Sequence, residues 1–324
     1  MLRLGSLNLA LPFFQAPLSG YSDYAMRHLA KLYGAPLTFA GVIIDKSAVH
    51  PKIIRKPAFR PGDDEHPIGA QIMGTESDTM AKAAKALVDT GYDLIDLNFA
   101  CPAPKVLRGG RGGHLMNEPK TAIEICRRVR ESVDCPVIMK LRIGFDDTPA
   151  SIDNFWQIAS SAPDAGIDAI VVHGRYVLQK FTGSANWDIF PQLKSTIPKM
   201  TIIGSGDLFD AKTISERFAN TGVDGIVIAR GAVGNPWIFR DLAALFSGKP
   251  IPPPPTLEEV GMAILEHLEL VCRLYDPNRA VRYLRKFIVG YCKHHPERKK
   301  ALKAILAAKD KSQLEDAVKW WYKI

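Results

Sequence analysis

The 324-residue sequence predicts an α/β fold, namely a (β/α)8 TIM barrel followed by a small C-terminal α-helical bundle. Three observations predict it: eight short apolar runs, amphipathic stretches of helical spacing between them, and a proline-rich segment after which no strand-like run occurs. Eight strand–helix units in about 240 residues agree with an α/β barrel in number and length. A doubly wound sheet is the alternative. It would need a glycine-rich fingerprint after the first strand, where Ala16-Pro17-Leu18-Ser19-Gly20 stands instead.

The expected strands are short apolar runs without the alternation of a half-exposed strand. Because parallel strands are covered by helices on both faces, such runs favour a parallel sheet. The strands are expected at Pro12–Ala16, Leu37–Val42, Ile68–Ile72, Leu94–Leu97, Val137–Leu141, Ala169–Val172, Thr201–Ile203 and Gly225–Ile228. Helical stretches between them include Asp23–Tyr33, Asp78–Asp89, Lys120–Val133, Ile152–Ala162 and Ala211–Ala219.

A proline-rich segment at residues 247–255, with the sequence SGKPIPPPP, divides the chain. Proline fixes φ and lacks an amide hydrogen, so this segment predicts a stiff, extended linker. We expect a barrel over residues 1–246 and a helical domain over residues 256–324. Thr256 and Glu259 have the spacing of a capping box at the start of that domain. Helical spacing then continues through Met262–Tyr275, Arg279–Tyr291, Lys300–Ala308 and Gln313–Tyr322.

The charge is unevenly distributed. The chain has 42 Lys and Arg against 34 Asp and Glu, and between residues 273 and 311 the ratio is 12 to 3. A nearly neutral body with a basic tail favours a polyanionic partner held by the tail, and a solvated helix surface is the alternative. The composition, 47% hydrophobic and 23% charged, excludes a disordered chain.

Targeting and redox features agree with a cytoplasmic protein. No apolar run approaches the ~20 residues of a membrane span, and the N-terminus has the early proline and broken apolar run that a signal peptide lacks. The five cysteines, at positions 101, 126, 135, 272 and 292, form no CxxC pair. A disulfide framework and a structural zinc site are therefore not expected. We expect a monomer with no metal and no obligate protein partner.

Polar or glycine residues stand where nearly every expected strand ends, which is where a barrel carries its catalytic groups. The strand ends in order are Ala16-Pro17, Gln71, Asn98 with Cys101, Lys140 with Arg142, His173 with Arg175, Gly204–Asp207, and Ala229-Arg230-Gly231. The last two groups precede expected helices, at 210–219 and 232–239. Glycines at helix N-termini, with an arginine, favour a phosphate site, and tight turns are the alternative reading.

Three of these side chains indicate chemistry. Lys140 follows an apolar strand and needs an anionic partner, which a reduced flavin or a carboxylate across the barrel mouth would supply. A Schiff-base role is the competing chemistry. His173, beside a glycine and Arg175, favours ligand contact over a core role. Cys101 precedes a cationic, glycine-rich segment at 105–114, expected to be a mobile loop. The nearby cations favour a thiolate nucleophile, whereas a thiol is equally suited to donate a proton to a carbanion.

The motifs APLSGYSD, GAQIMG, DLNFACPAPKV, MKLRIG, VVHGR, GSGDL and ARGAVGNPWIF resemble, in order, those of the bacterial-type tRNA-dihydrouridine synthase family. The resemblance runs from Ala16 to about Phe239, and Asn-x-x-Cys-Pro is its most specific motif. It implies a flavoprotein oxidoreductase that binds FMN, takes electrons transiently from NADPH and reduces the C5=C6 bond of uridine in tRNA. Hydride would pass from FMN N5 to C6, and Cys101 would give a proton to C5.

The resemblance also implies roles for matching positions. The cofactor would be bound by Ala16, Pro17, Leu18, Gln71, Lys140, His173, Ser205, Gly206, Asp207, Ala229 and Arg230. The tRNA substrate would contact Asn98, Lys105, Arg108, Arg111, Arg142, Arg175 and, in the helical tail, Arg282, Arg285 and Lys286. Three positions depart from the family pattern: Ala100 and Ala229 replace its usual glycines, and Ser205 replaces its usual asparagine.

Other functions remain as alternatives. A different FMN barrel oxidoreductase, acting on a free pyrimidine or an enone, explains the flavin contacts without the basic tail. An aldolase would use Lys140 as its Schiff base, and an RNA-binding or chaperone role would use the barrel only as a scaffold.

Overall fold

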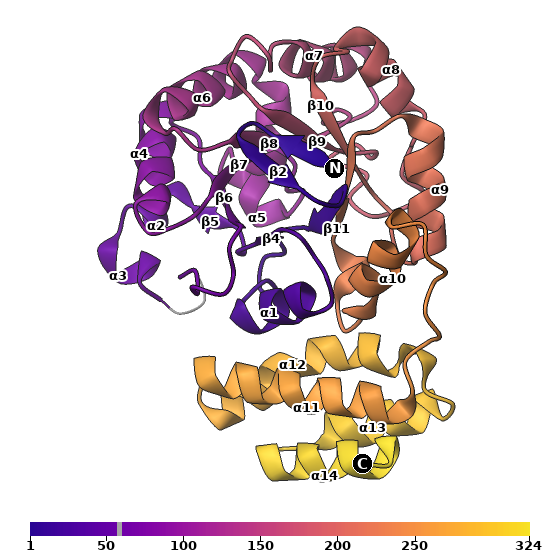
Figure 1. The fold of residues 1–324 in the computed structure, drawn as a ribbon. Coiled ribbons are helices and arrows are strands. Elements are labelled where there is room, and N and C mark those ends of the chain that lie inside the picture. The colour runs from indigo at the N-terminus through magenta and orange to yellow at the C-terminus, as the bar shows by residue number, and fades with distance from the viewer. Residues whose placement is uncertain (57–59) are drawn as a thin grey trace.

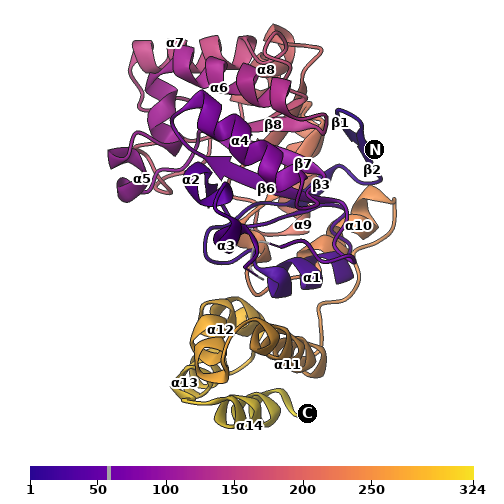
Figure 2. The same cartoon turned by 90° about the vertical axis from the view of Figure 1, so that its left-hand side faces the viewer.

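The computed structural model describes residues 1–56 and 60–324 and shows a parallel barrel with a helical tail (Figures 1 and 2). The barrel strands are β3 (Phe13–Gln15), β4 (Thr38–Phe39), β6 (Ile68–Met73), β7 (Leu94–Asn98), β8 (Val137–Arg142), β9 (Ala169–His173), β10 (Thr201–Ser205) and β11 (Gly225–Ile228). From β4 to β11 they pair in parallel in this order, and β11 pairs with β3; within the described residues, β3 and β4 form no strand pairing. The amide of Gln15 donates to the carbonyl of Leu37 at 3.1 Å, beside β4. The predicted fold class is confirmed.

Helices surround the barrel and cover its outer face, as Figure 1 shows. Five of them match the predicted helical stretches closely. The long ones are α1 (Tyr24–Leu32), α4 (Ser77–Val88), α6 (Pro119–Ser132), α7 (Pro149–Ser160), α8 (Ile189–Thr196), α9 (Ala211–Thr221) and α10 (Trp237–Phe246). Shorter turns are α2 (Asp45–Ala48), α3 (Pro51–Ile54), α5 (Pro104–Arg108), η1 (Gly112–Asn117) and η2 (Arg230–Ala232).

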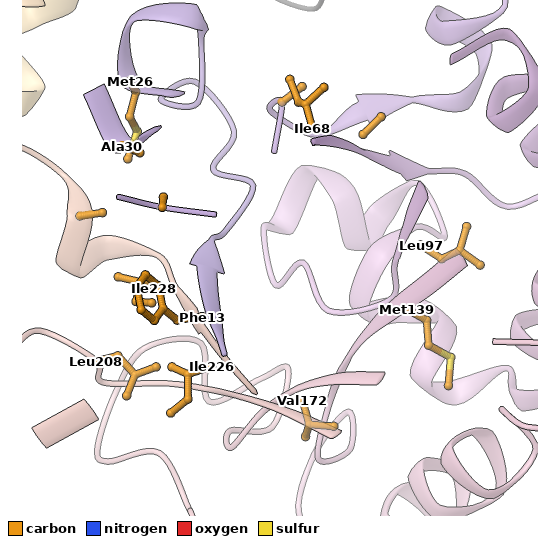
Figure 3. Packing of buried hydrophobic residues seen from close by; sticks show 14 of the residues in the cluster. Phe13, Met26, Ala30, Ile68, Leu97, Met139, Val172, Leu208, Ile226 and Ile228 are labelled. Atoms are coloured by element: carbon orange, nitrogen blue, oxygen red, sulfur yellow. The ribbon is translucent and has the colours of Figure 1, made fainter. Parts of the chain in front are cut away.

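Alternate residues of each strand belong to two different cores. Outward side chains such as Leu97, Met139 and Ile226 join the large core between strands and helices (Figure 3). Their inward neighbours form a smaller core inside the barrel, which includes Phe14, Phe39, Leu94, Ile138, Ala169, Ile203 and Val227. Two residues further along several strands, the inward positions become polar. The barrel therefore has an apolar bottom and a polar top.

An N-terminal hairpin closes the apolar end of the barrel. Its strands, β1 (Leu2–Leu4) and β2 (Leu7–Leu9), pair antiparallel, and Leu2, Leu4 and Leu9 are buried in the inner core. A Cβ at Gly225 would lie 2.7 Å from a Leu2 methyl carbon, so the hairpin packs directly on a strand end. The sequence analysis did not predict this plug.

Two predicted element bounds are wrong. The run predicted as one strand at 37–42 forms β4 and a second short strand, β5 (Ile43–Ile44), both paired with β6. Between them the amide of Gly41 donates to Ser22 in the β3–α1 loop rather than to a strand. The helix predicted at 232–239 begins only at Trp237. The chain turns first at Gly234, whose φ is +63°, and then passes Pro236, which precedes the helix.

The tail contains α11 (Leu257–Leu274), α12 (Pro277–Tyr291), α13 (Arg298–Ala307) and α14 (Lys311–Tyr322), with a short turn η3 (Cys292–His294). The capping box predicted at Thr256 and Glu259 is present. Among the described residues, 247–255 form neither helix nor strand. No helix in the described part of the chain is long and apolar enough to cross a membrane.

The tail is packed tightly on the barrel beside α1 and α10 (Figures 1 and 2). A Cβ at Gly234 would lie 2.2 Å from the Phe287 carbonyl oxygen, and one at Gly290 would lie 2.0 Å from the Val233 carbonyl oxygen. Because backbone meets backbone on both sides, only glycine fits at these two positions.

Candidate active site

A cavity opens at the polar end of the barrel. It encloses about 970 Å³ of space, a figure that includes open solvent at its mouth. All eleven residues predicted to bind a cofactor line it, together with Cys101, Asn98 and Arg142. Its wall also contains Ser19, Val42, Ala100, Pro102, Phe181, Leu208, Phe209, Val227 and Gly231.

A chain of hydrogen bonds forms the floor of this cavity. Asp96, Gln71 and Asn98 lie on neighbouring strands, because Gln71 on β6 pairs with Asp96 on β7. Gln71 Nε2 donates to Asp96 Oδ2 at 2.6 Å, and Asn98 Nδ2 donates to Gln71 Oε1 at 2.7 Å. Asn98 Oδ1 then accepts from the backbone amides of Ala100 at 3.1 Å and Cys101 at 3.0 Å. Asn98 therefore holds the turn that carries the Cys101 thiol.

Lys140 and Asp96 form a buried, electrostatically coupled pair. Burial raises the pKa of Asp96, and the charge of Lys140 opposes that rise. Burial lowers the pKa of Lys140, and the Asp96 carboxylate opposes that fall. Lys140 Nζ also donates to Ser205 Oγ at 3.4 Å. The sequence analysis foresaw a carboxylate partner for Lys140 as one alternative but did not identify Asp96.

His173 is held as a neutral imidazole. Burial, followed by the positive charges of Lys140, Arg142, Arg175 and Arg230, lowers the pKa of His173 to about 2. Its Nε2 lies 3.3 Å from Arg175 Nη1, which can only donate, so Nε2 accepts. The ring proton is therefore on Nδ1.

Arg175 does not face solvent as the RNA-contacting role would require. Its side chain is 2% exposed, and it donates to Asp207 Oδ2 at 2.7 Å and to the carbonyls of Thr182 and Gly183. With its donors occupied, it braces the β9–α8 loop and His173. Contact between Arg175 and the RNA stays a prediction, while its hydrogen bonds place it in the framework around the cavity.

Arg142 lines the cavity, but its guanidinium also donates hydrogen bonds to backbone carbonyls. It donates to the carbonyl of Ala100 at 2.9 Å and to those of Tyr176 and Lys180 at 2.9 and 2.7 Å. Burial and the neighbouring Arg175 lower the pKa of Arg142 to about 10. Arg142 thus helps Asn98 to hold the Cys101 turn in place.

The predicted phosphate end is cationic and closely packed. Arg230 lies 3.6 Å from Asp207 Oδ1, and its guanidinium lies over the rings of Phe181 and Phe209 at 4.5 and 5.3 Å. A Cβ at Gly231 would lie 2.1 Å from the Leu208 carbonyl, and one at Gly206 would lie 2.6 Å from the Ala185 methyl. The packing of the turns requires glycine at both positions, and a phosphate site at these strand ends stays a prediction.

The glycine-rich segment after Cys101 is not a loop, contrary to expectation. It forms α5 and η1, and the amide of Gly113 donates to the Cys101 carbonyl at 3.0 Å. A Cβ at Gly112 would lie 2.9 Å from that of Cys101. The glycines therefore let this segment pack against the Cys101 turn. Its cations are directed elsewhere: Lys105 and Arg108 are exposed, Arg111 is half-buried, and none of the three lines the cavity.

The three tail cations predicted to bind RNA differ in their surroundings. Arg282 is exposed. Arg285 donates to the Ala308 carbonyl at 2.7 Å. Lys286 donates to the Gly20 carbonyl and lies over the ring of Tyr283 at 3.2 Å. Of the three, only Arg282 is an exposed side chain of the kind expected to contact RNA.

Sequence reasoning missed Asp96, Phe181 and Phe209. A signal existed for Asp96, because residues two apart on a strand share a face and Asn98 was already placed in the site. Phe181 and Phe209 are 52% and 41% exposed at the rim of the cavity, on loops that no periodic pattern marks. Within the described residues, no group of three or more His, Cys, Asp or Glu side chains is arranged to hold a metal ion.

The fold and the cavity define an α/β-barrel enzyme with a half-buried thiol and a cationic ligand site. Comparison with known sequences identifies the family. The model of the family described as "Dihydrouridine synthase (Dus)" matches residues 14–320, and the chain belongs to this family. The prediction made from the motifs is confirmed.

Curated relatives match this sequence along nearly its full length. The chain is 35% identical over 300 residues to tRNA-dihydrouridine synthase B of Xanthomonas campestris pv. campestris, which covers 91% of this chain and 88% of that protein. It is 32% identical over 330 residues to a Mycobacterium tuberculosis protein named "Probable tRNA-dihydrouridine synthase", with 97% and 83% covered.

Solved structures show the same barrel at low identity. The chain matches morphinone reductase in complex with tetrahydroNAD with a TM-score of 0.55 and 14% identity, covering 78% of this chain and 91% of that one. It matches histamine dehydrogenase from Rhizobium sp. 4-9 with a TM-score of 0.58 and 14% identity, covering 83% of this chain and half of that one. These likenesses concern the fold.

Proposed function

We propose that this protein is a tRNA-dihydrouridine synthase, which reduces the C5=C6 bond of uridines in cytoplasmic tRNA with bound FMN and with NADPH as the electron donor. The observation that carries the proposal is one cavity that brings Cys101 together with Lys140, Arg230 and the other residues assigned to the cofactor. Family membership and the names of the curated relatives support the same activity.

The residues present fit FMN. The amide nitrogens of Gln71 and Asn98 supply hydrogen-bond donors at the floor, and Lys140 supplies a cation for the edge of the ring that becomes negative on reduction. Arg230 supplies a cation for the phosphate at the ends of the last two strands, where barrels commonly bind one. Once reduced by NADPH, FMN bound here would supply a hydride from its N5 to C6 of the uracil ring.

Cys101 is placed to complete the reduction. Once C6 has received hydride, C5 carries enolate-like charge and needs a proton, which the Cys101 thiol donates. Asn98 and Arg142 both bind the backbone of the turn that carries the thiol, so the proton donor is fixed before substrate arrives. The target base must leave its stack to reach the cavity, at a cost of a few kcal/mol, which RNA contacts of the tail offset.

The experiment is reduction of unmodified tRNA by the purified protein with FMN and NADPH, followed by site-mapped mass spectrometry. We expect a gain of two hydrogens at specific uridines and yellow flavin in the protein. Turnover of free uridine as fast as that of tRNA would favour the free-pyrimidine oxidoreductase instead. A colourless protein with an imine that borohydride traps at Lys140 would favour the aldolase.

A further inference from the structure

The two amides at the floor of the cavity are fixed in a single orientation. The backbone amides of Ala100 and Cys101 can only donate, so the Asn98 atom that they contact must be the carbonyl oxygen. Asn98 Nδ2 then faces Gln71 Oε1, which leaves Gln71 Nε2 to face position 96. An acceptor is required there, and the Asp96 carboxylate provides one.

This chain uses one hydrogen of each amide nitrogen, although an amide nitrogen carries two. Within the described part of the chain, nothing accepts the second hydrogen of Gln71 Nε2 or of Asn98 Nδ2, and both side chains line the cavity. Gln71 is 1% exposed and Asn98 is 5% exposed. A buried donor without an acceptor costs about 1–3 kcal/mol, so this floor calls for acceptors on the ligand.

We propose that Asp96 is a positioning residue that holds Gln71 and Asn98 as N–H donors, and that this floor selects a ring whose facing edge carries carbonyl oxygens. The inference rests on the proposed function and adds to it a basis for specificity. Uracil and the pyrimidine end of the flavin share this chemistry, since both carry carbonyls at C2 and C4. Cytosine carries an amino group at C4, whose hydrogens would oppose the donors of the floor.

Three variants separate the role of Asp96 from a general effect on folding. Asp96→Ala removes the acceptor and leaves the Gln71 amide free to rotate. Asp96→Asn keeps an oxygen that accepts from Gln71, so it serves as the conservative rescue. The double variant Gln71→Glu/Asp96→Asn keeps the net charge and both links of the chain, because amide nitrogens at 96 and 98 both donate to the new carboxylate. Position 71 then offers no N–H to the ligand.

The readouts are the FMN dissociation constant, the absorption spectrum of the bound flavin, the melting temperature, and the KM for tRNA. Asp96→Ala is expected to weaken FMN binding about tenfold, and Asp96→Asn to recover most of that loss. The double variant is expected to melt like wild type yet bind FMN about tenfold more weakly, with a shifted flavin spectrum. An unchanged FMN affinity with a tRNA KM raised about tenfold would also support the proposal and would mean that the floor holds the uracil.

The proposal is overturned if the folded double variant keeps the wild-type FMN affinity, flavin spectrum and tRNA KM together. A failure of the proposed function looks different. In that case the wild-type protein itself would bind no FMN and reduce no uridine.

Discussion

The barrel mouth and helix α12 are both rich in cations, but the two regions use them differently. In the mouth, Arg142 and Arg175 are buried and donate to backbone carbonyls, so they hold loops in place. On α12, Lys286 is likewise bound to a carbonyl, whereas Arg282 on the same helix is exposed. A cation whose donors are occupied by the backbone is therefore part of the framework. Charge counted along a sequence does not separate such residues from those that bind a ligand.

The largest effect is expected in the barrel mouth, from Cys101→Ser. An alcohol is a much weaker acid than a thiol, so turnover of tRNA should fall by at least about 100-fold while bound FMN is retained. Single-turnover kinetics of flavin oxidation by tRNA measure this loss. Cys272→Ser, in the tail, is the matched control. Full activity of the Cys101 variant would remove this thiol from the mechanism.

The next effect concerns the tail as the element that holds RNA. If about four phosphates are contacted, tRNA affinity should fall roughly 100-fold between 50 and 200 mM salt. The reason is that log K falls by about 0.7–0.9 per phosphate contact for each tenfold rise in salt concentration. Filter binding or fluorescence anisotropy across that range gives the slope. FMN affinity, measured in parallel, reports on the barrel mouth alone. A slope near zero for tRNA would mean that the tail does not hold the RNA through its charge.

A matched pair on α12 sharpens the comparison. Lys286→Met removes a charge bound to Gly20 and to the Tyr283 ring, so it should lower the unfolding free energy by about 1–2 kcal/mol and leave the salt slope unchanged. Arg282→Met should leave stability unchanged and reduce the salt slope by about 0.7–0.9. Thermal melts and salt titrations of both variants test this. Equal salt slopes in the Lys286 and Arg282 variants would contradict the view that Arg282 contacts RNA and Lys286 does not.

The smallest effect is a pH dependence that originates in the tail. Burial, and then the charge of Lys286, lower the pKa of His267 to about 3. Below its ordinary pKa of 6.5 the unfolded chain binds a proton that the native protein does not bind until about pH 3. Stability is therefore lost as pH falls from 6.5, by up to about 1.4 kcal/mol per unit.

His267→Gln should remove this contribution, so its unfolding free energy should decline less steeply between pH 6 and 5 than that of wild type. Denaturant titrations at several pH values measure the two slopes, and His294→Gln, at an exposed position of the same tail, is the control. Parallel slopes for wild type and the His267 variant would mean that this imidazole is not buried in the neutral form.

The sequence by itself determined the barrel and most of the contents of its cavity. Eight apolar runs mark the strands, and the positions of Gln71, Asn98, Lys140 and His173 near the C-terminal ends of these strands place them at the same end of the barrel. The prediction succeeds because all strands of a parallel barrel end at the same rim, and alternate residues of each strand point into the barrel. The same rule, applied to Asp96, would have placed that carboxylate beside Asn98.

Only the tertiary structure decided where the long and the small side chains act. Lys286 reaches the carbonyl of Gly20, 266 positions earlier in the chain. Val106 and Val177 pack where a Cβ of Gly112 or Gly113 would stand, so these glycines are held in place by their neighbours. A long cation binds whichever carbonyl the packing of distant elements brings within reach, and a glycine is required wherever another segment approaches its Cα closely. Neither contact has a periodic signature, because both partners are set by the packing of the whole chain.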